Sequence, residues 1–198
     1  MRMLGIDPGL RLTGYGCVEG DLSAPVLVEA GVFRLGKAPS ATIEEAPGLG
    51  GAAAVSSRLA ELEHDLCAAI ERLKPEAAAV ESLFAHYKHP ATAIIMGHAR
   101  GVILLALRRA RLPLIELKPN EVKKSITGNG HADKSQMQRA VQVQFNLAEP
   151  PSPPDVADAI AIALCAARRW SRREELGETA VIRPARSRRR LASGTFPI

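Results

Sequence analysis

The first nineteen residues hold two short strand-like runs on either side of a tight turn. The runs, residues 2–7 and 13–19, predict the strands of a hairpin. Pro8 fixes φ and Gly9 tolerates positive φ, so the chain turns immediately after Asp7 and leaves its carboxylate at the end of a strand. Asp-Pro-Gly is also ordinary turn chemistry, so Asp7 is either a plain turn residue or a site acid.

Predicted helices and strands alternate through the rest of the chain. Residues 26–35 supply a third strand, and the Gly-, Pro- and Ala-rich residues 36–50 predict a loop. Between residues 51 and 73 apolar side chains recur every three or four positions, which predicts an amphipathic helix. We expect further strands at residues 76–81 and 114–117, and helices at 91–112, 120–126, 134–146 and 155–168. This order predicts an α/β fold with a mixed five-stranded sheet flanked by helices.

The charge of the chain is unevenly distributed. Its 198 residues carry a net charge of +5, but nine arginines lie between residues 168 and 190 against three glutamates, so the remainder is close to neutral. With 46% hydrophobic residues, the chain can bury one sizeable core. We expect one domain over residues 1–170 and a disordered, arginine-rich tail over residues 171–198.

The three cysteines indicate which cellular compartment the protein occupies. Cys17, Cys67 and Cys165 are far apart and surrounded by apolar residues, which favours buried thiols over disulfides or a zinc site. This predicts a reducing cytoplasm. No apolar leader precedes Asp7, and charged residues interrupt the later apolar runs, so we expect neither a signal peptide nor a membrane span.

Carboxylates recur at positions where they could meet. Glu81 ends a short Ala/Val run much as Asp7 ends the first strand, while Asp155 and Asp158 share one face of the last predicted helix. Acids at a helix N-terminus also stabilise orphan N–H groups, so a capping role stays open. Asp158, however, lies in the apolar run 156–164, where an unpaired carboxylate is costly. Four such acids favour a hard divalent cation such as Mg²⁺.

Several motifs, in order over about residues 1–168, resemble those of the bacterial RuvC Holliday junction resolvases. They are Ile6-Asp7-Pro8-Gly9 with Thr13-Gly14-Tyr15-Gly16, Glu81-Ser82-Leu83-Phe84, Gly97-His98-Ala99-Arg100-Gly101-Val102, Val122-Lys123-Lys124 through Gly128-Asn129-Gly130, Asp133-Lys134-Ser135-Gln136 and Asp155-Val156-Ala157-Asp158-Ala159. Three features depart from the family pattern: His98 in place of glutamine, the long loop at residues 36–50, and the arginine-rich tail.

The resemblance implies a ribonuclease-H-like homodimer that nicks two strands of a four-way DNA junction symmetrically, in recombination and repair. It implies that Asp7, Glu81, Asp155 and Asp158 bind two Mg²⁺ ions per site, with Mn²⁺ able to substitute. The products would carry a 5′-phosphate and a 3′-hydroxyl. It also implies partnership with the RuvA and RuvB branch-migration proteins and a preference for a short T-rich site.

Candidate DNA contacts lie outside the acids. Lys123, Lys124, Lys134 and Arg139 form a basic cluster, which could also be a solvated helix face. The resemblance singles out Lys123 and Lys134, which match lysines important for cleavage. Periodicity alone predicts that Phe84 is a core residue, whereas the resemblance implies a ring that stacks on an unpaired base.

Two other classes of protein share parts of this pattern. An actin-like or sugar-kinase ATPase also begins with a strand, an acid and glycines, but it needs a second Asp-x-Gly-x-Thr phosphate loop, which the sequence lacks. A junction-binding protein without catalysis could keep the lysines, but it would have little reason to hold four acids in this arrangement. A four-way junction assay that reads both binding and nicking in Mg²⁺ separates the three.

Overall fold

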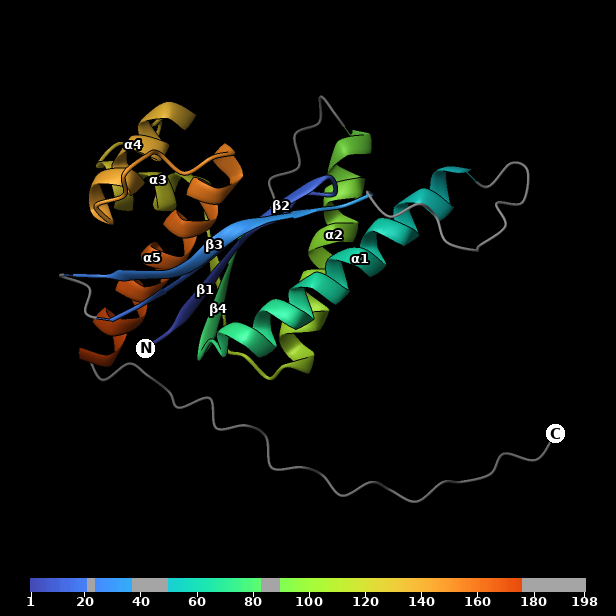
Figure 1. Cartoon of the computed structure of the whole chain (residues 1–198), viewed down its shortest axis with the longest axis horizontal. Coiled ribbons are helices and arrows are strands. Elements are labelled where there is room, and N and C mark those ends of the chain that lie inside the picture. The colour runs from blue at the N-terminus through green and yellow to red at the C-terminus, as the bar shows by residue number, and fades with distance from the viewer. Residues whose placement is uncertain (21–23, 37–49, 83–89, 176–198) are drawn as a thin grey trace, which may run out of the picture.

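The computed structural model describes residues 1–20, 24–36, 50–82 and 90–175. A five-stranded mixed sheet lies at its centre, in the order β3-β2-β1-β4-β5 (Figure 1). Its strands are β1 (Met3–Asp7), β2 (Leu12–Glu19), β3 (Val26–Arg34), β4 (Ala77–Glu81) and β5 (Leu114–Leu117). β1 and β2 form the predicted hairpin and β3 extends it into an antiparallel meander, while β4 runs parallel to both β1 and β5.

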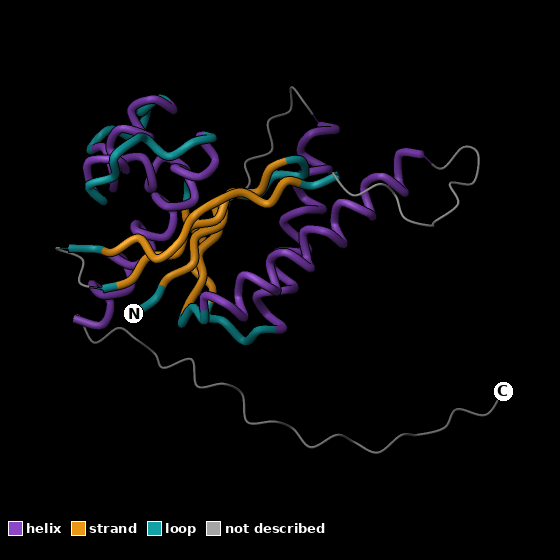
Figure 2. The backbone as a smooth tube through the Cα atoms, in the orientation of Figure 1, coloured by secondary structure: helices purple, strands orange, loops and turns teal. Residues whose placement is uncertain are grey.

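Helices cover both faces of this sheet. They are α1 (Gly50–Leu73), α2 (Pro90–Arg109), α3 (Pro119–Thr127), α4 (Lys134–Gln144) and α5 (Pro154–Glu175). α1 and α2 pack together over one face, α5 crosses the other, and α3 and α4 pack on α5 (Figures 1 and 2). Among the described residues, no helix has the length and apolar character needed to cross a bilayer.

The two-residue period of β1 sorts its side chains between the two faces. Leu4 and Ile6 are buried in the core formed with α1 and α2, whereas Met3 is buried in the core formed with α5. Gly5 lies directly against α5. The next residue on that side is Asp7, so the alternation turns its carboxylate toward α5.

Glycines allow α5 to approach the sheet at backbone distance. A Cβ atom at Gly5 would overlap the backbone of Ala159 and Ala163, and one at Gly14 would overlap the backbone of Asp155. Any larger residue at these positions would force the helix away from the strands. α5 is correspondingly rich in buried alanine, so the contact is close along much of its length.

The predicted elements are all present, but three helices end more than one residue away from the expected position. α4 ends at Gln144 rather than at residue 146, where Asn146 takes a positive φ of 49°. α2 ends at Arg109 rather than at residue 112, because Arg111 takes a positive φ of 59° in a turn before β5. α5 continues to Glu175, so the domain boundary expected at residue 170 lies inside a helix. Its last turn carries Arg and Glu, good helix formers without an apolar period, which the hydrophobic pattern could not reveal. Where the domain ends stays a prediction, and residues 176–198 lie outside the described part.

Candidate active site

Two of the four predicted acids meet at one edge of the sheet. Asp7 is the last residue of β1 and Glu81 the last of β4. The parallel pairing of Ile6 with Val80 brings the ends of these strands side by side. Ala77 and Ala79 pack in the core formed with α5, so the same alternation turns Glu81 toward α5. Both carboxylates therefore lie on the α5 side of the sheet.

The other two acids come from the first turns of α5. Gly14 is the register partner of Asp7 across β1 and β2, and a Cβ atom at Gly14 would overlap the backbone of Asp155. The start of the helix therefore lies directly over the end of β1. Asp158, one turn further on, is half-buried between buried neighbours. Three elements that are distant in sequence thus bring together all four predicted acids.

The titration of these acids reflects their proximity. Burial, followed by the charges of Asp158, Glu81 and Asp155, raises the pKa of Asp7 from 3.8 to about 8. Burial and the charge of Asp158 likewise raise the pKa of Glu81 from 4.5 to about 7. The pKa of Asp158 is also raised, mainly by burial. Like charges forced into a poorly hydrated site disfavour ionisation, and a cation would relieve that cost.

Two of the predicted basic residues lie near the acids. The positive charge of Lys134 partly opposes the rise in pKa of both Asp7 and Asp158. The charge of Lys123 does the same for the pKa of Glu81 and Asp158. Lys124 is exposed on the next position of α3, and Arg139 is exposed on α4. Phe84 lies outside the described residues.

The lysines are held by the packing of α3 and α4 on α5. Asp133 caps α4 by accepting a hydrogen bond from the Gln136 N–H at 2.8 Å, immediately before Lys134. The Arg168 guanidinium on α5 donates to the Ser125 carbonyl at 2.8 Å and to the Gln144 side chain at 3.0 Å. One arginine therefore links the last turns of both lysine-bearing helices to the helix that carries two acids.

The four acids supply the oxygen ligands that hard divalent cations prefer. Within the described ranges, no three His, Cys, Asp or Glu side chains converge closely enough to hold an ion as they stand. Asp7, Glu81 and Asp158 nevertheless carry pKa values raised by burial, with repulsion between neighbouring acids adding to each. In its chemistry, this set of carboxylate donors fits a divalent cation.

Sequence reasoning did not identify the supporting residues. The close approach of Gly5, Gly14 and Gly16 to α5 sets the helix position, and the alternation of glycine in Gly14-Tyr15-Gly16 was the available signal. Arg168 lies among the other arginines near the C-terminus, and nothing in its local sequence distinguishes it.

Comparison with known proteins identifies the family of this chain. A family model described as "Crossover junction endodeoxyribonuclease RuvC" matches residues 49–166. The protein of that name from Rhodopirellula baltica is 45% identical over 163 residues, which cover 82% of this chain and 84% of that protein. The one from Chloroflexus aggregans is 45% identical over 83% of this chain and 92% of its own length.

Solved structures give the same result. Thermus thermophilus RuvC in complex with a Holliday junction substrate matches with a TM-score of 0.67 at 31% identity, over 84% of this chain and 93% of that one. Another structure of T. thermophilus RuvC matches with a TM-score of 0.68 at 30% identity, over 89% of this chain and 97% of that one. With its ribonuclease-H-like fold, the chain therefore belongs to the RuvC family of crossover junction endodeoxyribonucleases, metal-dependent enzymes that resolve Holliday junctions.

Proposed function

We propose that Asp7, Glu81, Asp155 and Asp158 are the metal-binding catalytic acids with which this chain nicks four-way DNA junctions. The observation that carries the proposal is the meeting of β1, β4 and α5 at one sheet edge, where burial and the other three acids raise the pKa of Asp7 to about 8. Asp7 interacts with every other acid of the set, so it is the natural shared ligand. Ion pairing that only stabilises the fold does not explain the site, because two nearby lysines cannot neutralise four acids.

The bound ions, which we propose to be two Mg²⁺ with Mn²⁺ able to replace them, would polarise the scissile phosphate and activate the attacking water. Lys123 and Lys134 face the same acids from α3 and α4, and we assign them to the phosphate oxygens, where negative charge develops. Lys124, exposed beside Lys123, would contact the DNA backbone. Hydrolysis in this arrangement leaves a 5′-phosphate and a 3′-hydroxyl.

From the sequence alone, we also propose that Phe84, three residues after Glu81, stacks on an unpaired base at the crossover. As further partners we propose the RuvA and RuvB proteins, which the family resemblance implies. The cysteines Cys17, Cys67 and Cys165 are free thiols, in keeping with the cytoplasm as the compartment.

We propose that the enzyme acts as a homodimer, because symmetric nicking requires two active sites. The outer face of α2 supports this proposal. Ile94 and Leu105 are 61% and 47% exposed, and Ile95 is exposed beside them. A Cβ atom added at Gly97 or Gly101 would meet nothing within 4 Å, so this face is open. An apolar helix face with small residues suits close packing against the same helix of a second copy.

Replacing Asp7 with asparagine tests the assignment of the acids. Asp7→Asn removes one ligand charge and leaves the phosphate contacts intact, so nicking should fall by about 100-fold or more. Junction affinity without divalent metal should change little. Nicking of a synthetic four-way junction over a Mg²⁺ titration, together with fluorescence anisotropy, measures the two quantities.

Asp65→Asn on α1 provides the matched control, because it makes the same chemical change away from the acids and should nick normally. Near-normal nicking by Asp7→Asn at saturating Mg²⁺ would remove Asp7 from the active site.

A further inference from the structure

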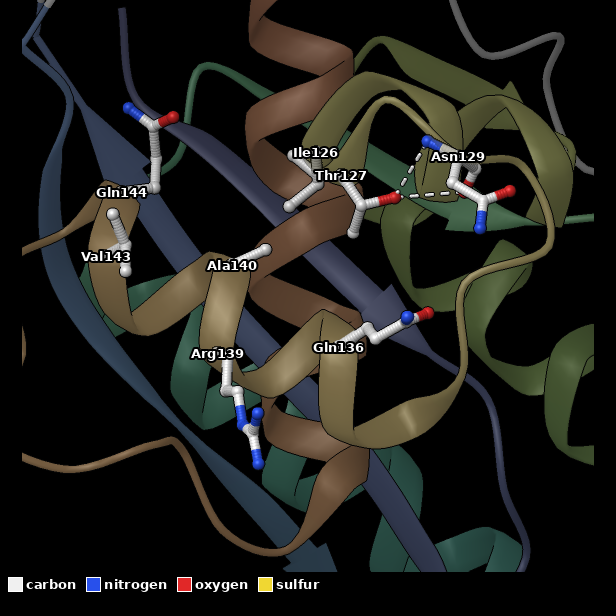
Figure 3. Close-up of a pocket in the computed structure, with 8 residues that line it drawn as sticks. All are labelled: Ile126, Thr127, Asn129, Gln136, Arg139, Ala140, Val143 and Gln144. Atoms are coloured by element: carbon white, nitrogen blue, oxygen red, sulfur yellow. Dashed lines mark hydrogen bonds between the residues drawn. The ribbon is translucent and has the colours of Figure 1, made fainter.

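A cavity of about 530 Å³ lies between the C-terminal end of α3, the loop that follows it, and α4 (Figure 3). It is separate from the four acids, and none of the residues that line it is acidic. Its polar lining consists of the Arg139 guanidinium, the Thr127 hydroxyl and three side-chain amides, from Asn129, Gln136 and Gln144. The Thr127 hydroxyl is already hydrogen-bonded to backbone groups of Lys123 and Asn129, so the guanidinium and the amides determine what the cavity can bind.

The three amide oxygens are already engaged within the protein. Each accepts a hydrogen bond at 3.0 Å: that of Asn129 from the His131 backbone N–H, that of Gln136 from the Asp133 backbone N–H, and that of Gln144 from the Arg168 guanidinium. Because every partner is an N–H donor, the orientation of each amide is fixed. Within the described part of the chain, the three NH₂ groups make no hydrogen bond, so they remain available as donors.

The other two glutamines of α4 behave in the opposite way. Gln138 donates its NH₂ group to the Pro151 carbonyl at 2.8 Å. Gln142 donates to the Leu147 and Ala148 carbonyls at 3.3 and 3.2 Å. Both therefore use their donors to hold the segment that follows α4, whereas the cavity-lining amides keep theirs free. The cavity thus presents donors and a positive charge, and its ligand must be an acceptor.

We propose that this cavity binds a backbone phosphodiester of the junction DNA, away from the scissile phosphate. A phosphodiester offers oxygen acceptors and one negative charge, which match the amide NH₂ groups and Arg139. The apolar part of the lining, Ile126 and the 80% exposed Val143, suits the sugar beside that phosphate.

The position on α4 also fits a DNA strand that reaches the active site. Gln136 lies two residues after Lys134, whose charge acts on Asp7 and Asp158. The two side chains leave different sides of the helix, but both lie in its first turn, so a strand held by Lys134 near the acids can reach the cavity by passing over this end of α4. The inference rests on the proposed active site and adds a second point at which this chain holds its substrate.

Binding of the full-length chain to a four-way junction, measured over a range of salt concentrations, tests the site. Gln136→Glu replaces a donor with a negative charge, and Arg139→Gln removes the cation. Each should weaken binding several-fold and reduce the slope of log K against log [salt] by about 0.9, the value for one lost phosphate contact. Ala148→Glu adds the same charge at an exposed position just after the same helix, outside the cavity, and should leave that slope unchanged.

Junctions that carry a single neutral methylphosphonate, moved one position at a time along the strand, identify the phosphate. When the methylphosphonate stands at the contacted position, the wild type should lose as much affinity as Gln136→Glu loses on the unmodified junction. Gln136→Glu itself should lose no further affinity on that modified junction. Equal slopes for Gln136→Glu and Ala148→Glu, or no position with this coupling, would overturn the proposal. So would binding of inorganic phosphate in the cavity without coupling to any DNA phosphate.

The experiment distinguishes failure of this site from failure of the active-site assignment. Metal-dependent nicking by the wild type, and its loss in Asp7→Asn, do not depend on Gln136. Thermal melting of each variant separates a lost contact from a lost fold.

Discussion

Asp7 shows how the charge of a single residue opposes folding. Burial and the neighbouring Asp158, Glu81 and Asp155 raise its pKa to about 8, against 3.8 for the free side chain. Between these values the folded chain keeps a proton that the unfolded chain has released. The free energy of unfolding therefore decreases as pH rises through this window, and the same holds for Glu81 between 4.5 and about 7.

We expect the metal-free enzyme to melt at a lower temperature at pH 8 than at pH 5. Asp7→Asn removes the charge that burial opposes, so it should remove much of this dependence. At pH 8 it should raise the free energy of unfolding by about 1 kcal/mol or more, equivalent to roughly 2–4 °C in Tm. Differential scanning calorimetry across the pH range measures both effects.

Added Mg²⁺ should stabilise the wild type more at pH 8 than at pH 5, and Asp7→Asn less than the wild type. Asp65→Asn on α1 controls for the loss of one charge. An Asp7→Asn protein that melts below the wild type at pH 8 without metal would contradict the expected repulsion.

At the scale of single residues, the sequence allowed the four acids to be named as candidates because each ends a strand or lies near the start of a helix. Their convergence required more, since Asp7 and Asp155 are far apart in the chain and meet through the register of β1 and β2. Lys123 and Lys134 were singled out by resemblance, while the amide orientations beside Arg139 depend on tertiary hydrogen bonds. No local pattern encodes such bonds.

Among the elements, α5 determines the site, because it supplies two acids and packs in backbone contact with β1 and β2. Gly14 packs against the backbone of Asp155, and Gly16 packs against Ile160. The periodicity of the chain predicted the helices and strands themselves. It could not predict this contact, because a glycine's absent side chain leaves no hydrophobic signal.

We predict that Gly14→Ala displaces the start of α5. The added Cβ would overlap the Asp155 backbone, so the free energy of unfolding should fall by about 1–3 kcal/mol. Nicking should fall more than junction binding, because Asp155 and Asp158 move relative to Asp7. Chemical denaturation and junction nicking of the same variant provide the two measurements.

Gly51→Ala in α1 is the matched control, because a Cβ there meets nothing within 4 Å. It should leave the free energy of unfolding unchanged or slightly higher. Normal stability and nicking in Gly14→Ala would show that α5 tolerates displacement.

For the whole molecule, the sheet and its helices describe one chain, whereas the homodimer that we propose needs a surface for a second copy. The α2 face of Ile94, Ile95, Gly97, Gly101 and Leu105 is the exposed apolar surface that we assign to the partner copy. The sequence showed the spacing of Gly97 and Gly101, but their exposure became evident once α1 had covered the opposite side of α2.

A charged residue at Leu105 should separate the proposed dimer. Leu105 is 47% exposed in the single chain, so Leu105→Glu should cost the isolated subunit little stability. Burial of that charge against a second copy would be strongly unfavourable. Sedimentation velocity should show a shift from dimer to monomer, and paired nicking should fall with it.

Val26→Glu, at a 55% exposed position on β3, serves as the control outside the α2 face. An unchanged dimer in Leu105→Glu would move the contact to another surface.

The glycine contacts of α5 also limit how this protein could change over generations. On the proposed site, a substitution of Asp7 should remove cleavage and leave the packing intact, so one substitution would produce a binding protein without nuclease activity. A substitution of Gly5, Gly14 or Gly16 disturbs packing and acid geometry together. Small stepwise shifts in the position of the acids are therefore selected against, because they disturb the packing. Complete loss of the acids' chemistry does not carry this cost.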